Sequence, residues 1–199
     1  MPRQFLFTKE QIAAAALQLV REQGAKALTA RALGQRLGCS SKPIFSLFEN
    51  MAQVQQAVLT AANGVYQQAL KQSMAAGKYP PYKASGMAYI QFAREEKELF
   101  KLLFMRDRSG ETVQENKKEL RPLLNLLQKN LNLSEQQAYL FHLQMWVYVH
   151  GIATMVATNY LNWDDAFVSG VLTNAYLGLK SCTEKGGSKA WNRLLKPKI

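Results

Sequence analysis

The stretch that decides the fold runs from Thr8 to Leu59 and reads TKEQIAAAALQLVREQGAKALTARALGQRLGCSSKPIFSLFENMAQVQQAVL. Thr8 and Gln11 have the spacing of a capping box, and apolar residues then recur at helical spacing until the next glycine. A second cap at Thr29 predicts a short helix that ends at Gly38. We expect this second helix to bury Ala32, Leu33 and Leu37.

A third helix is predicted directly after the glycine turn. It begins at Ser40 and carries Ile44, Phe45 and Phe48. It is too short to be stable alone, so it must pack against the first two helices. Two helices joined by a tight turn, with a third packed behind them, present one helix to the major groove of DNA.

Two segments of this stretch carry a family resemblance. The pattern A…L…GA…LT…ALGQRLG leads to Gly38, and Gly38–Phe48 follows it. Together they resemble the N-terminal domain of TetR-family transcriptional regulators, and Gly38–Phe48 looks like the recognition helix of that family. The resemblance covers the first third of the chain without gaps. The alternative is a generic helical hairpin with alanine-rich packing.

The expected DNA contacts follow from the position of polar side chains on and around this helix. Lys42 is the long cationic donor of the recognition helix, which suits it to guanine readout or to a phosphate contact. Thr29 would act through its hydroxyl and the amides of its helix. Base-edge contacts are expected from Ser40, Ser41, Lys42 and Ile44, phosphate contacts from Thr29, Arg31 and Phe45, and a contact from the N-terminal arm through Arg3.

Composition agrees with a polyanionic partner. The 199 residues include 25 Lys and Arg against 14 Asp and Glu, a net charge of +11. Both ends of the chain are basic, but only the N-terminal part has the architecture to read a groove. The two cysteines, Cys39 and Cys182, show no paired spacing, which indicates free thiols and a cytoplasmic protein. Neither a signal peptide nor a membrane-spanning segment is expected.

The rest of the chain reads as helices, so the predicted fold is all-α with about nine helices. Asn50 caps a long helix to about Gly77, and Pro80 and Pro81 begin the next element. Pro122 should bend a later helix or mark its end. We expect a helix-turn-helix domain over residues 1–49, a helical effector-binding and dimerisation domain over 50–183, and a basic tail over 184–199.

This second part also resembles the effector-binding body of one TetR subgroup, through Phe92–Ala93, Trp146 and His150–Gly151. The resemblance implies a small, largely apolar effector and a homodimer formed by the last two long helices. Trp146 and His150 share a helix face, and His150 would be the one polar anchor. An aromatic stripe is also typical of plain core, and a lone histidine of a structural contact. The expected ligand contacts are Tyr89, Phe92, Phe100, Phe104, Met105, Trp146, His150 and Met155.

Enzyme motifs are not found, so the chain is not expected to be an enzyme. No nucleophile elbow, phosphate loop or HExxH pattern is present, and His142 and His150 are poorly spaced for one metal. Neither a cofactor nor a metal is expected. The predicted function is a dimeric DNA-binding repressor that a ligand releases from its operator. The alternatives are a ligand-independent DNA-binding protein and a helical ligand-binding protein with a degenerate head.

Overall fold

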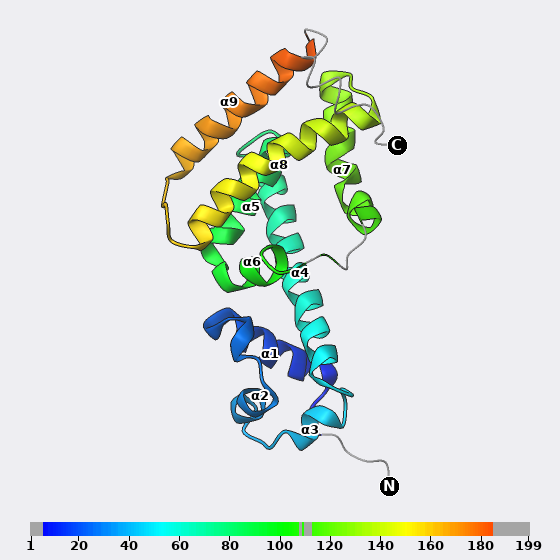
Figure 1. Ribbon diagram of the computed structural model, residues 1–199, viewed down its shortest axis with the longest axis vertical. Coiled ribbons are helices and arrows are strands. Elements are labelled where there is room, and N and C mark those ends of the chain that lie inside the picture. The colour runs from blue at the N-terminus through cyan, green and yellow to red at the C-terminus, as the bar shows by residue number, and fades with distance from the viewer. Residues whose placement is uncertain (1–5, 108, 110–112, 185–199) are drawn as a thin grey trace. The chain divides into compact units, whose positions relative to one another are not determined.

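The computed structural model describes residues 6–107, 109 and 113–184, and this part of the chain contains helices and no strand (Figure 1). The fold class is all-α, as predicted. The elements are α1 (Lys9–Gln23), the 3-10 helix η1 (Ala25–Ala27), α2 (Ala30–Arg36), α3 (Lys42–Phe45), α4 (Met51–Ala75), α5 (Pro81–Glu95), α6 (Lys97–Phe104), α7 (Val113–Leu131), α8 (Glu135–Ala157) and α9 (Asp165–Glu184).

Contacts divide the chain into two compact units, which are described here one at a time. The first unit comprises Met1–Ala69 and Phe92–Arg106, and the second comprises Leu70–Gln91 and Asp107–Ile199. The first unit therefore contains α6 and the end of α5 as well as the predicted DNA-binding helices. This division differs from the domain boundaries expected from the sequence, which stay a prediction.

The core of the first unit is formed by apolar residues from α1 to α4. Both caps predicted for α1 and α2 are present: Thr8 and Gln11 form the capping box, and Thr29 Oγ1 accepts a hydrogen bond from the Ala32 amide at 3.1 Å. Leu33 is buried, but Ala32 and Leu37 are only partly buried, contrary to expectation. The fully buried side chains that hold these helices together include Ile12, Val20, Leu33, Ile44, Val54 and Val58.

Helix α6 packs against α1 through both charged and apolar residues. Arg21 Nε donates to Glu96 Oε2 at 2.7 Å, which joins α1 to the residue that precedes α6. Glu98, in the first turn of α6, accepts from Lys101 Nζ at 2.6 Å. Its carboxylate lies over Gly24, where an added Cβ would meet Glu98 Oε2 at 2.8 Å. Since Gly24 also has a φ of +81°, only glycine fits this junction without strain.

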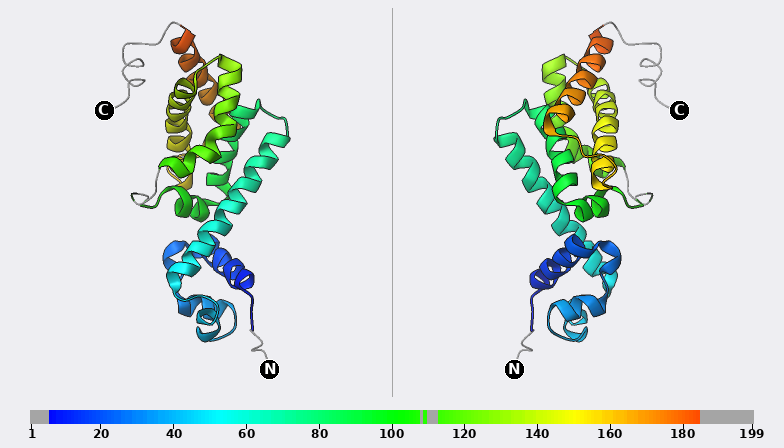
Figure 2. Two further views of the ribbon diagram at one scale, coloured as in Figure 1. Left: turned by 90° about the vertical axis from the view of Figure 1, so that its right-hand side faces the viewer. Right: turned by 90° about the vertical axis from the view of Figure 1, so that its left-hand side faces the viewer.

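In the second unit, α8 is the central helix and α9 packs along it (Figure 2). A capping box of Ser134 and Gln137 begins α8. Asp164 Oδ1 accepts from the Phe167 amide at 2.7 Å and so caps the start of α9. Helix α7 continues past Pro122, which shows that this proline does not end the helix.

Helix α8 is long and apolar enough to cross a membrane by length and composition alone. No membrane span was predicted from the sequence, and one helix that passes by length and composition does not contradict that prediction. The same composition is typical of a core helix, and α8 buries Phe141, Met145 and Val156 within the second unit. One such helix is therefore weak evidence for a membrane protein.

Gly34 gives a direct test of the packing around the turn after α2. A Cβ at this position would lie 2.9 Å from the carbonyl oxygen of Cys39, which is backbone and cannot move aside cheaply. We expect Gly34→Ala to lower the free energy of unfolding by about 1–3 kcal/mol, as overpacking does. Gly64→Ala is the matched control, because Gly64 is exposed within α4 with open space around it. The control should raise stability by up to about 1 kcal/mol in urea denaturation. Equal effects of the two changes would contradict the close approach.

Candidate functional site

The turn between α2 and α3 is fixed by backbone hydrogen bonds. The Cys39 amide donates to the Gly34 carbonyl at 2.9 Å, and the Gly38 amide donates to the Gln35 carbonyl at 3.1 Å. Gly38 has a φ of +67°. These three features define a Schellman motif, in which a left-handed residue ends the helix and satisfies its last carbonyls. The turn therefore sets the direction in which the chain leaves α2, and α3 begins at Lys42 after five intervening residues.

Most of the residues predicted to contact DNA are exposed around this turn. Lys42 begins α3 and is exposed, and Phe45 at its end exposes 43% of its surface. Thr29, Arg31 and Ser40 are exposed as well, and Ser41 is half-buried. Arg3 lies outside the described residues.

Ile44 does not fit its predicted role. Its side chain has no exposed surface, because α3 turns it into the core of the first unit. A residue buried to this extent cannot reach a base edge while the unit keeps this conformation. An apolar residue in α3 could contact either a base or the core, and the burial of Ile44 favours the core contact.

The cations near α2 differ in their surroundings. Arg36 forms a two-pronged ion pair with Glu22, with Nη1–Oε2 and Nη2–Oε1 distances of 2.7 Å. The hydrogen bond from Arg36 lowers the pKa of the Glu22 carboxyl. Arg36 thus ties α2 to α1, whereas Arg31 and Lys42 form no ion pair with any described residue. Arg31 and Lys42 are the better placed of these cations to bind phosphate.

The second unit contains two tyrosine–histidine pairs between α5 and α8. The Tyr82 hydroxyl lies 3.0 Å from His142 Nδ1, and the Tyr89 hydroxyl lies 2.9 Å from His150 Nδ1. The tyrosines are seven residues apart and the histidines eight, so the two pairs follow each other by two helical turns. Only Tyr89 and His150 were predicted as site residues. The matched spacing in the two segments is the signal that could have identified the other pair.

Burial keeps these imidazoles neutral. It lowers the pKa of His142 to about 4 and also lowers the pKa of His150, which is less buried. Burial raises the pKa of Tyr82, so this phenol keeps its proton. The pairs are therefore hydrogen bonds between uncharged groups in the physiological pH range.

His150 also stacks on Trp146, with ring centroids 4.7 Å apart and an interplanar angle of 15°. Thr154 follows one turn later, and its buried hydroxyl has no hydrogen-bond partner. A buried hydroxyl without a partner is costly, and a bound polar group would relieve that cost. Trp146, His150 and Thr154 therefore form a stripe on α8 with two polar groups between apolar surfaces.

The other predicted ligand contacts are divided between the two units. Phe92 and Phe104 pack edge-on against Tyr66 in the first unit, at centroid distances of 5.3 Å each, and Phe100 packs against Phe104 at 5.2 Å. Tyr66 had not been predicted. Met105 is exposed in the first unit, and Met155 is exposed on α8. The structure thus brings together two subsets of the predicted residues, and their assembly into one site stays a prediction.

Comparison with known families matches residues 82–171 to a family model described as tetracyclin repressor-like, C-terminal domain. This match supports a TetR-family regulator. The match begins in α5, includes α6, α7 and α8 and ends in α9, so it covers the tyrosine–histidine pairs and the stripe on α8. Curated proteins give no match to the chain. The matched domain suggests a TetR-type regulator, a class associated with DNA and a small-molecule effector in general.

The buried His142 predicts how stability depends on pH. Its pKa is about 4 when folded and near 6.5 when unfolded, so the unfolded chain binds a proton more readily. The contribution of neutral His142 to the free energy of unfolding should therefore be complete above about pH 6.5. It should fall by about 3 kcal/mol as the pH drops from about 6.5 to 4. His142→Gln should remove most of this difference in denaturant titrations over the range. His150→Gln is the matched control on the same helix and should retain it. A parallel pH profile for wild type and His142→Gln would contradict the assignment.

Proposed function

We propose that this TetR-family protein is a dimeric repressor that binds operator DNA through α3 and releases it when a small apolar molecule binds. The observation that carries DNA recognition is the fixed turn after α2 with exposed Ser40, Lys42 and Phe45 around it. In a helix-turn-helix protein, the N-terminal residues of the second helix contact base edges. Ser40 and Lys42 occupy that position here, and Thr29 and Arg31 at the start of α2 would bind phosphates.

The proposed dimer rests on the exposed apolar residues of the last two helices. Of the eleven large apolar side chains that are exposed among the described residues, seven lie on α8 and α9. Such exposure is typical of a surface that binds another protein. Gly151, Gly170 and Gly178 also have open space around the position of a Cβ, which leaves room for the close approach of a partner helix. The seven residues are Leu143, Trp146, Val147, Tyr148, Met155, Phe167 and Leu177.

The proposed effector site is centred on the stripe of Trp146, His150 and Thr154. Its polar groups are a neutral imidazole and an unpaired hydroxyl, so the group they bind should be uncharged. A mostly apolar molecule with one hydroxyl or carbonyl fits this chemistry. Its binding would alter the spacing of the two α3 helices in the dimer, which must be about 34–36 Å to enter successive major grooves.

Lys42 tests DNA recognition. Duplexes selected from a random-sequence library on the wild-type protein are titrated in a mobility-shift assay, and Lys42→Ala should bind the selected duplex at least about tenfold more weakly. Loss of a base contact would also relax the preference at one position, whereas loss of a phosphate contact would weaken binding to all sequences alike and lower the salt slope. Lys71→Ala is the matched control, since Lys71 is exposed on α4 and was not assigned to the interface. Failure to select any sequence, or equal binding by Lys42→Ala and wild type, would contradict the proposal.

Gly170 tests the dimer. Gly170→Leu adds a side chain where the same chain has no atom within 4 Å, so each subunit should keep its helical content and thermal stability or gain slightly. The leucine would occupy the space of the partner helix, and we expect the variant to sediment as a monomer at micromolar concentration. Gly64→Leu on α4 is the matched control and should remain dimeric. A dimeric Gly170→Leu variant would show that α9 is not the contact surface.

A further inference from the structure

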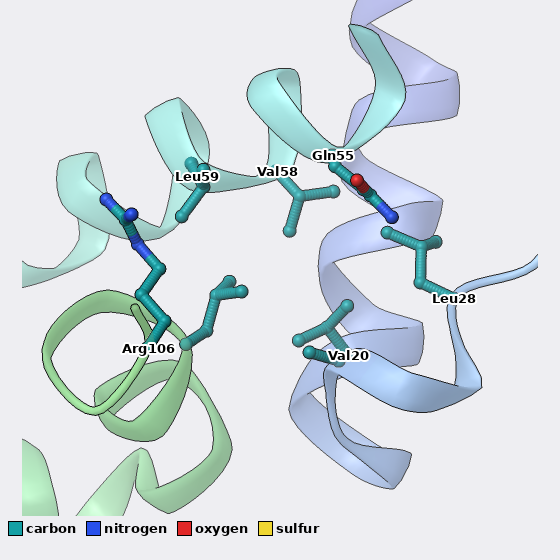
Figure 3. Close-up of a pocket in the computed structure, with 8 residues that line it drawn as sticks. Val20, Leu28, Gln55, Val58, Leu59 and Arg106 are labelled. Atoms are coloured by element: carbon teal, nitrogen blue, oxygen red, sulfur yellow. The ribbon is translucent and has the colours of Figure 1, made fainter. Parts of the chain in front are cut away.

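The inner face of α3 belongs to the core of the first unit. Ile44 has no exposed surface, and Phe48, four residues further on, is buried as well. The same core includes Val20 of α1 and Val58 of α4, which border a small apolar pocket of about 180 Å³ among α1, η1, α4 and α6 (Figure 3). Because two side chains about one turn apart are held in this core, α3 cannot rotate about its axis. Its outer face is therefore defined.

The outer face of α3 carries one long cation and one aromatic ring. Lys42 and Phe45 are three residues apart, so they lie on the same side of the helix. Lys42 is exposed, and Phe45 exposes 43% of its surface. Among the described residues, the Phe45 ring stacks on no other ring and lies under no cation. An apolar surface thus stays open beside a cation.

The side chains around Phe45 indicate what covers this ring. Ser40, Lys42 and Ser46 are exposed beside it, and Arg31 is exposed at the start of α2. A partner protein would be expected to meet a larger apolar patch than one ring among polar and basic residues. The major groove of DNA fits better, because its base edges are polar and its phosphates are negative. The one apolar group on those edges is the C5 methyl of thymine, which phenylalanine can contact.

A phosphate contact, the role expected for Phe45 from its position in the sequence, suits this side chain less well. A phenyl ring has no hydrogen-bond donor and no charge, so it cannot bind a phosphate oxygen as Arg31 or Lys42 can. An apolar ring that covers a methyl group gains free energy by removing both from water. The chemistry of the residue therefore favours a base contact.

We propose that Phe45 is a specificity-determining residue that reads the C5 methyl group of a thymine in the major groove. This inference rests on the proposed binding of operator DNA through α3. Residues three apart in a helix differ by about 4.5 Å along its axis, and successive base pairs by about 3.4 Å. The thymine should therefore lie within about two base pairs of the position that Lys42 contacts.

The test uses uracil, which pairs as thymine does and lacks only the methyl group. The probe is the duplex selected on the wild-type protein from a random-sequence library, and each thymine is replaced by deoxyuridine in turn. In mobility-shift titrations, replacement of the contacted thymine in one half-site should weaken wild-type binding about fourfold, the equivalent of one buried methyl group. Replacement in both half-sites should weaken it about 15-fold, since each half-site is bound by one α3.

Two variants assign the methyl contact to Phe45. Phe45→Ala should bind the thymine and uracil duplexes equally, because the ring that distinguishes them is gone. Phe45→Tyr keeps the ring and should keep the fourfold difference. Phe45→Gln keeps a long side chain without the ring and provides the same comparison as Phe45→Ala if that variant unfolds. Tyr160→Ala is the matched control, since it removes another exposed ring, 75% exposed after α8, and should behave as wild type.

The possible failures are distinguishable. Equal wild-type binding after replacement of every thymine would overturn the methyl contact, as would a selected duplex with no thymine near the Lys42 position. A difference that persists in both Phe45→Ala and Phe45→Gln would assign the contact to another residue. Each of these results leaves operator recognition standing, because Lys42→Ala is measured on the same duplex. Failure to select any duplex would overturn operator recognition and the methyl contact together.

Discussion

The approach of the turn at Cys39 to the backbone of α2 is the constraint on which the DNA-binding architecture depends. It requires a residue without a side chain at position 34 and a left-handed residue at position 38, and both are glycine. With these two in place, the amides of Gly38 and Cys39 satisfy the last carbonyls of α2. Helix α3 has only four residues and could not form alone. Its direction is set by this turn and by the burial of Ile44 and Phe48. The exposure of Lys42 follows from that direction.

The second consequence of the packing is that α6 belongs with the DNA-binding helices. Sequence position alone puts α6 in the body, and the matched family domain includes it. Yet Arg21 pairs with Glu96, and the carboxylate of Glu98 rests on Gly24. A shift of α6 would have to break an ion pair that is only partly exposed and would open the apolar pocket beside it. Movement of α6 is therefore coupled to α1 by contacts within one unit, with no long pathway needed.

Local patterns predicted the elements well and their environments less well. The caps at Thr8, Thr29, Asn50 and Ser134 are all present, because a cap is a contact between residues three apart and is visible in the sequence. The burial of Ile44 could not be read in the same way, since it depends on which face of a four-residue helix meets α1 and α4. The apolar composition of α8 likewise cannot distinguish a membrane span from a core helix, because that depends on what the helix packs against. Tertiary contacts such as Arg36 with Glu22 join residues fourteen apart and leave no local signal.

The tyrosine–histidine pairs show how a buried polar group can fix the register of two helices. A slide of one turn between α5 and α8 would disturb their close packing, in which an added Cβ at Gly86 would lie 3.2 Å from Val149 Cγ2. The slide would also break two hydrogen bonds that lie two turns apart, one at the buried His142 and one at the partly buried His150. The neutral state of His142 is part of this arrangement, because a buried charge would need a counterion that neither tyrosine supplies. In the Tyr82–His142 pair the histidine is buried. In the Tyr89–His150 pair the histidine is less buried and stacks on Trp146, so this imidazole lies nearer the surface. A ligand that binds His150 would therefore act on a helix whose position along α5 is already set, and its effect would be to tilt or rotate α8 rather than to slide it.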